Sequence, residues 1–124
     1  MFKNLLLIGT GGFAGSALRF LISRYIELQV FTSFPLGTFV VNVVGCFIIG
    51  AIYGLATENL ASPEIRFLLA TGFCGGFTTF SSFSYESLSL VQDGQIWYVF
   101  LYLAGSLFAG IMAAWLGLLI TEVV

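Results

Sequence analysis

Residues 72–84, with the sequence GFCGGFTTFSSFS, gather the side chains of this chain that are best suited to binding a small polar solute. The pair Gly75-Gly76 is followed by threonine and serine hydroxyls, and the uncharged run 67–85 is long enough for a helix to cross hydrocarbon. Backbone that leaves the helix at membrane depth must be buried in protein or line a wet cavity, because lipid offers its polar groups no partners. We therefore expect a helix broken at Gly75-Gly76 beside a polar path, with a mere kink as the alternative.

Two phenylalanines in this stretch, Phe80 and Phe83, are spaced i, i+3 and therefore share one helical face. Their neighbours, such as Ser81, carry hydroxyls, and the edge of an aromatic ring carries the positive side of its quadrupole. Such an edge can meet an anion without a formal charge. The alternative is ordinary core packing, because the chain contains 14 phenylalanines.

Asn42 lies midway along the uncharged run 28–57, where a polar side chain is unusual. Its amide nitrogen offers donor hydrogens, and neutral donors can replace the water around a small anion without trapping it as a full positive charge would. Thr38 lies one turn earlier on the same face and Ser81 follows Phe80, so both could donate hydroxyls as well. The alternative for Asn42 is a hydrogen bond between helices.

Membrane-spanning helices must position these residues, because the chain is 59% hydrophobic and 8% charged, with a mean hydropathy of +1.05. The predicted fold class is an all-α membrane protein, a single domain over residues 1–124 with four transmembrane helices, the third broken near its centre. We expect the spans near residues 4–26, 36–57, 65–90 and 96–121. A cleaved signal peptide is the alternative for the first span, although the remaining chain would still be membrane-bound.

The positive charges give almost no preference for one orientation in the membrane. Lys3 and Arg66 lie on one side of a four-span chain, whereas Arg24, together with Arg19, lies on the other. Such a chain can insert either way round, so that two oppositely oriented copies pair about an axis in the membrane plane. Four helices are also few for enclosing a polar path. We therefore expect an antiparallel dimer.

Small residues recur at four-residue spacing and let helix backbones approach closely. They form the pairs Gly11/Gly15 and Gly50/Gly54 and, in the last span, a stripe of Gly105, Ala109, Ala113 and Gly117. Each set could form a dimer face or pack within one subunit. For the stripe in the last span, the dimer face is the favoured interpretation.

Several function classes are excluded by what the composition offers. The chain has no histidine, and Cys46 and Cys74 fall inside predicted spans without a disulfide framework or a metal-binding spacing. It has no paired carboxylates and no nucleophile with a base, so we expect no enzyme. A net charge of −2 without a basic patch excludes nucleic acid as a partner. The glycine-rich start, LLLIGTGGFAG, lacks the βαβ pattern of a nucleotide site.

Three segments, taken together, resemble the small dual-topology fluoride channels of the bacterial camphor-resistance type. They are GGFAGSALRF (11–20), PLGTFVVNVVGCFIIG (35–50) and GFCGGFTTFSSFSYE (72–86). The resemblance implies a multi-pass protein of the bacterial plasma or inner membrane, surrounded by membrane lipid, that exports cytoplasmic fluoride by passive electrodiffusion. It also implies an antiparallel homodimer with fluoride pathways and a structural sodium ion at its centre. A heterodimer with a second homologous chain stays open.

The resemblance assigns roles to several residues of the path. Asn42 would face the ion, and Phe80 and Phe83 would form an aromatic box beside it. Tyr102 and Ser106 would begin a track of hydroxyls, whose length is open because the next two turns carry Gly110 and Ala114.

Three further positions match the family pattern. The backbone carbonyls of Gly75 and Thr78 would hold the sodium ion. Arg19 would open toward a vestibule, with snorkelling to the membrane surface as the alternative. Glu86 matches a family acid, to which we assign no ion contact.

A small proton-coupled multidrug exporter of dual topology is the main competing class. It needs a carboxylate embedded in its first span. This chain offers only Glu27, at the edge of that span, and Glu86, near the end of the third. A noncatalytic membrane assembly subunit is the second alternative, and it would not explain the Gly-Gly pair.

Overall fold

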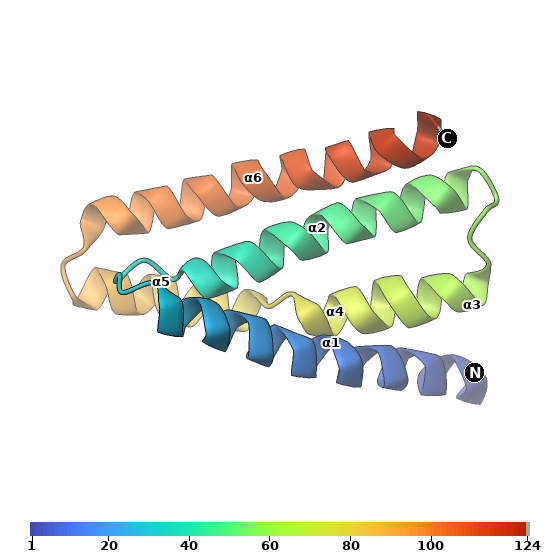
Figure 1. Ribbon diagram of the computed structural model, residues 1–124, viewed down its shortest axis with the longest axis horizontal. Helices are drawn as coiled ribbons and strands as arrows, with labels where there is room; N and C mark the ends of the chain where they lie inside the picture. Colours follow the sequence, from blue (N-terminus) through green and yellow to red (C-terminus); the bar gives the residue numbers. More distant parts are fainter. Residues whose placement is uncertain (124) are drawn as a thin grey trace.

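The computed structural model describes residues 1–123, all of whose regular elements are helices (Figure 1). Helix α1 covers Phe2–Gln29, α2 Leu36–Thr57 and α6 Ile96–Val123. Between α2 and α6 lie α3 (Pro63–Ile65), the π-helical η1 (Arg66–Cys74), α4 (Gly75–Phe77) and α5 (Phe80–Gln92). The elements from α3 to α5 follow one another along a single bent rod, and both termini lie at the same end of the bundle (Figure 1).

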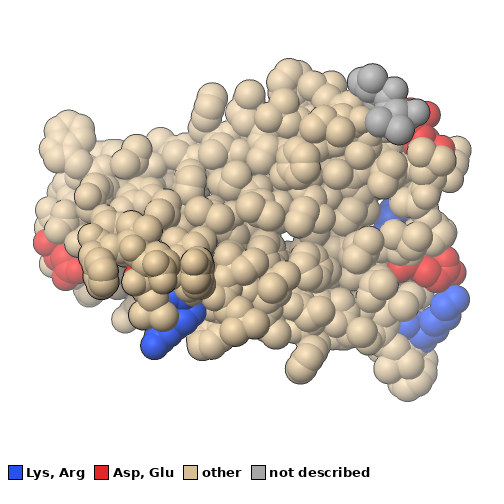
Figure 2. All heavy atoms as spheres, in the orientation of Figure 1, with Lys and Arg blue, Asp and Glu red and all other residues tan. Residues whose placement is uncertain are grey.

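Three helices are long and apolar enough to cross a membrane, namely α1, α2 and α6. On the face shown in Figure 2, the charged side chains gather toward the two ends of the long axis, and the surface between them is almost free of charge. This distribution is what a bilayer requires, because a charge in the hydrocarbon region is costly unless it is paired.

The turns carry the local chemistry that ends one helix and starts the next. Ser62 caps the bent rod by accepting a hydrogen bond from the N–H of Ile65 at 3.2 Å, and Pro63 follows at the first helical position. Gly94, between α5 and α6, has a φ of 73°, which glycine adopts without strain.

Close backbone contact joins α1 to the first part of the rod. A Cβ on Gly11 would collide with the carbonyl oxygen of Leu68, and one on Gly15 with that of Phe73. Both glycines are buried. This pair therefore packs within the subunit, against η1.

The small residues of α2 and α6 also pack within one subunit. A Cβ on Gly50 would collide with the carbonyl of Ala114, and one on Gly117 with that of Phe47. Ala113 is buried as well. At Gly117 the stripe in the last predicted span packs against α2 of the same chain, so its favoured interpretation as a dimer face is wrong there; for Gly105 and Ala109, which are only partly buried, it stays a prediction.

The predicted break is present in the bent rod, but it does not fall at Gly75-Gly76. The helix runs through both glycines to Phe77, and the backbone becomes extended at Thr78 and Thr79. Gly76 is needed for another reason: a Cβ there would lie 2.5 Å from the carbonyl oxygen of Gly12 in α1. Gly76 thus permits close packing, whereas a Cβ on Gly75 would meet nothing within 4 Å, and the threonines after them interrupt the helix.

Candidate functional site

The interruption between α4 and α5 is built from extended threonine backbone. Thr78 has φ −94° and ψ 157°, and Thr79 has φ −148° and ψ 121°. The Thr79 hydroxyl then caps α5 by accepting a hydrogen bond from the N–H of Ser82 at 3.1 Å. The chain leaves one helix and starts another within two residues.

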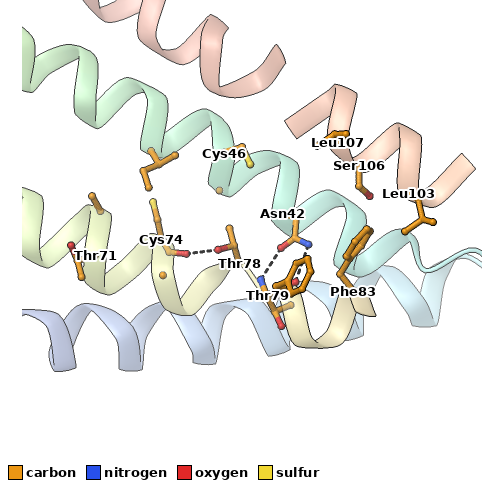
Figure 3. Close-up of a pocket in the computed structure, with 15 residues that line it drawn as sticks. Asn42, Cys46, Thr71, Cys74, Thr78, Thr79, Phe83, Leu103, Ser106 and Leu107 are labelled. Atoms are coloured by element: carbon orange, nitrogen blue, oxygen red, sulfur yellow. Dashed lines mark hydrogen bonds between the residues drawn. The ribbon is translucent and has the colours of Figure 1, made fainter. Parts of the chain in front are cut away.

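Asn42, from the middle of α2, holds this interruption open. Its Oδ1 accepts a hydrogen bond from the N–H of Thr79 at 2.8 Å, and its Nδ2 donates to the carbonyl of the same residue at 3.2 Å (Figure 3). The side-chain amide thus satisfies backbone groups that the helix has released. This is the interhelical hydrogen bond proposed as the alternative for Asn42. One hydrogen on Nδ2 is still free to donate to an ion.

A groove of about 680 Å³ runs past the interruption. Its lining comes from α2, the bent rod and α6, and it includes hydroxyls, an amide, two thiols and apolar side chains but no charged residue. The lining residues are Asn42, Gly45, Cys46, Ile49, Ala70, Thr71, Cys74, Gly75, Thr78, Thr79, Phe80, Phe83, Leu103, Ser106 and Leu107. A solute in this groove meets polar groups without meeting a formal charge.

Four predicted path residues line this groove: Asn42, Phe80, Phe83 and Ser106. The rings of Phe80 and Phe83 lie 5.9 Å apart between centroids, so they share a face as expected. The Oγ of Ser106 is buried and has no hydrogen-bond partner among the residues described. A buried hydroxyl without a partner is costly, and it is suited to receiving a polar solute from the groove.

Thr38 and Tyr102, also predicted for the path, meet instead at Glu86. The Thr38 hydroxyl donates to Oε2 at 3.0 Å, and the Tyr102 hydroxyl donates to Oε1 at 3.1 Å. Both donors are buried, with 5% and 0% of their surfaces exposed. Their contact with an ion stays a prediction, and it requires Glu86 to share or release these hydroxyls.

Glu86 is the functional candidate that sequence reasoning missed. It joins α5 to both α2 and α6, whereas from the sequence it was only matched to a family acid and assigned no ion contact. A usable signal was present, because Glu86 follows Phe83 by three residues and so extends the face that carries both rings.

The remaining predicted residues lie around the interruption. The Ser81 hydroxyl is 3.2 Å from that of Thr79 and does not line the groove. Arg19, from α1, donates through Nε to the carbonyl of Gly76 at 3.0 Å. Gly75 and Thr78 both line the groove.

The carbonyls next to the break differ in how they are used. The carbonyl of Cys74 accepts from the N–H of Thr78 at 3.0 Å and from its hydroxyl at 2.9 Å. Within residues 1–123, the carbonyls of Gly75 and Thr78 receive no such bond. That these two oxygens hold a cation, as the family resemblance implies, stays a prediction.

Comparison with known proteins identifies the family of this chain. Residues 6–118 match the family described as CrcB-like protein, Camphor Resistance. A relative from Chlorobium phaeobacteroides (strain BS1), named fluoride-specific ion channel FluC, is 52% identical over 94% of this chain and 91% of its own length. Relatives of the same name from Prosthecochloris aestuarii and Flavobacterium psychrophilum are 51% and 47% identical, over 98% and 97% of this chain and 95% and 98% of their own lengths. The resemblance found in the sequence is confirmed, and the chain belongs to the CrcB-like, camphor-resistance family.

Proposed function

We propose that this multi-pass membrane protein is a fluoride-selective channel that lets cytoplasmic fluoride leave the cell passively. The observation that carries the proposal is the uncharged groove beside the interrupted helix, where neutral donors and aromatic edges take the place of a formal positive charge. The relatives' name identifies a channel and its ion. It also confirms the expectation that the chain is not an enzyme, and it favours neither a drug exporter nor an assembly subunit.

The chemistry of the groove suits fluoride, which is small, strongly hydrated and a strong hydrogen-bond acceptor. The free hydrogen on Nδ2 of Asn42 and the unpartnered hydroxyl of Ser106 can each donate to it. The ring edges of Phe80 and Phe83 add positive electrostatic potential without binding the ion too firmly to leave. The fluoride ion can then pass along the groove by moving between neighbouring sites that each bind it weakly.

We infer four membrane spans, the third over residues 65–90 and formed mainly by η1, α4 and α5 together, and an antiparallel pair of copies. Phe80, at the groove, is 79% exposed in a single chain. A second copy over the groove would cover this ring and separate the path from lipid. The nearly balanced positive charges at the two ends of the bundle support insertion in both orientations.

The dimer would also complete a sodium site. The free carbonyls of Gly75 and Thr78 fit a hard monovalent cation, because carbonyl oxygens carry partial negative charge and two copies would supply both pairs. Among residues 1–123 no three His, Cys, Asp or Glu side chains cluster as metal ligands. The bound ion would draw the two interrupted helices together.

A liposome efflux assay with fluoride and chloride tests the proposed function. The parent should release fluoride and retain chloride. Phe80→Ile keeps apolar bulk and removes the positive ring edge, so efflux should fall sharply while the dimer still assembles. Phe108→Ile is the matched control, because Phe108 is similarly exposed, at 69%, and lies outside the groove. Equal rates of fluoride efflux in the parent, Phe80→Ile and Phe83→Ile would show that these rings only pack and do not contribute to the fluoride path.

Labelling and diffraction test the dimer and its cation. Lys3 is the only lysine, so a membrane-impermeant amine reagent should reach it in half of the copies from each side of a vesicle. Labelling from one side alone would exclude the antiparallel pair. Anomalous scattering after a soak with a heavier monovalent cation should place an ion between two copies of Thr78, and continuous contact without an ion there would exclude the sodium site.

A further inference from the structure

The carbonyl of Gly76, at the end of the first part of the rod, is bound by two side chains of α1. Arg19 Nε donates to it at 3.0 Å, and Ser16 Oγ lies at 3.5 Å. Arg19 is only partly exposed, and no acidic side chain of the described residues pairs with it. The guanidinium is therefore engaged with backbone rather than with a carboxylate.

The position of the Gly76 carbonyl explains why the Arg19 guanidinium binds it. The last carbonyls of a helix lack partners and carry partial negative charge, so a cationic donor at that end is favoured. The first part of the rod ends at Phe77, only one residue after Gly76. Arg19 thus serves as a C-terminal cap that comes from a neighbouring helix.

Close packing brings the guanidinium within reach. Gly12 of α1 approaches Gly76 so closely that a Cβ on Gly76 would lie 2.5 Å from the Gly12 carbonyl oxygen and 2.9 Å from Ser16 Oγ. Arg19 lies about two turns beyond Gly12 on α1, so its side chain meets the end of the first part of the rod, at Gly76.

We propose that Arg19 is a positioning residue. It fixes the end of the first part of the rod, just before the break, and it occupies the Gly76 carbonyl with a donor from α1. The Thr79 carbonyl is similarly occupied by Asn42. The carbonyls of Gly75 and Thr78 are then left to face a cation. This last step rests on the proposed function, whereas the capping of Gly76 does not.

Two substitutions separate the donor from the bulk of the side chain. In Arg19→Gln the amide nitrogen stands the same number of bonds from Cα as Arg Nε, so a neutral donor remains. In Arg19→Met a methyl group takes that place and donates nothing. Arg24→Met is the control, because it removes a positive charge from the exposed side of the same helix.

Amide hydrogen exchange of the purified full-length protein tests the cap without reference to fluoride. Arg19→Met should raise exchange in residues 76–82 about tenfold, the loss expected for one hydrogen bond to a charged group, and leave α6 unchanged. Arg19→Gln, which keeps a neutral donor but loses the charge, should fall between the parent and Arg19→Met, and Arg24→Met should stay close to the parent. Equal exchange in the Gln and Met variants, or an equal rise in Arg24→Met, would overturn the proposal. If the Met variant fails to fold, a folded Gln variant supports the cap and an equally unfolded one overturns it.

Two further readouts connect the cap to the ion sites. Sodium should raise the melting temperature of the parent and of Arg19→Gln, but less so that of Arg19→Met. Fluoride efflux should fall in the same order. A parent that does not conduct fluoride would refute the proposed function and leave the exchange result standing, whereas parental exchange in Arg19→Met would refute the cap alone.

Discussion

The two parts of the interrupted helix, Pro63–Phe77 and α5, are held by different kinds of contact. Backbone approach through glycines joins α1 to η1 and α4. Helix α5 packs against α2 and α6 instead, through the hydrogen bonds of Asn42 and Glu86 and through contacts of aromatic rings. The first part is therefore fixed mainly by shape, with polar bonds from α1 only near its end at Gly76, and the second mainly by polar and aromatic partners. The predictions below test this difference, in descending order of their effect on stability.

Gly15→Ala should have the largest effect. The new methyl group would meet the backbone of Phe73 and Phe77, which cannot move aside as a side chain can. Overpacking of this kind costs about 1–3 kcal/mol, and the higher value is expected against backbone. Thermal unfolding in detergent measures it. Gly9→Ala is the matched control on α1, because nothing lies within 4 Å of its Cβ, and it should be neutral or slightly stabilising. Similar melting temperatures for the two variants would show that close backbone packing does not hold α1 against the rod.

Asn42→Asp should come next. The carboxylate can still accept from the N–H of Thr79, but it faces the Thr79 carbonyl without a donor. We expect a loss of about 1–3 kcal/mol and very little fluoride efflux, because the carboxylate also repels the anion. Asn42→Leu removes both hydrogen bonds and should be less stable than Asn42→Asp. The reverse order would mean that the amide does not hold the interruption open.

Glu86→Gln should have a smaller effect. Its amide oxygen can accept from one hydroxyl while its nitrogen donates to the other, so the loss should be about 1 kcal/mol. A double-mutant cycle with Tyr102→Phe tests the contact, because Phe keeps the ring that lies 4.8 Å from Phe83. Strictly additive losses would show that Glu86 and Tyr102 do not stabilise each other.

Lys3→Ala should have the smallest effect. Lys3 and Glu64 form an exposed ion pair at 3.3 Å, and pairs of this kind contribute little. Backbone hydrogen bonding and the Lys3 ammonium lower the pKa of Glu64 from its ordinary value of 4.5. Any stabilisation is therefore complete above that value and is lost as the pH falls through the lower pKa of the folded protein. Melting curves of parent and variant should coincide near neutral pH, and a clear separation there would contradict this.

The helices could be predicted largely from the spacing of charges and turn residues. The second predicted span, 36–57, coincides with α2, and the fourth, 96–121, ends two residues before α6 does. The first predicted span, 4–26, lies within the longer α1, which continues to Gln29 through residues that are polar enough to suggest a membrane edge.

The place of the break could not be predicted from the glycines. Gly76 serves a contact with α1, and Asn42 stabilises the extended Thr79, and both partners are distant in sequence. A local signal did exist, because a threonine three residues before Ser82 is a typical helix cap.

The site was predicted in part for a similar reason. Helical spacing placed Phe80 and Phe83 on one face, and the groove unites them with Asn42 and Ser106. Spacing along one helix cannot show which acceptor a hydroxyl on another helix will choose. The bonds from Thr38 and Tyr102 to Glu86 therefore became visible only in the folded chain.

The pairing of Asn42 with Thr79 determines which substitutions positions 42 and 79 can tolerate. Asn42 binds the N–H and the carbonyl of position 79, groups that every amino acid except proline provides. Position 79 is therefore free to vary among residues that can cap α5, whereas position 42 must keep a side chain that both donates and accepts at that length. A library randomised at both positions and selected for growth in fluoride should retain asparagine at 42 and recover serine, aspartate and asparagine beside threonine at 79.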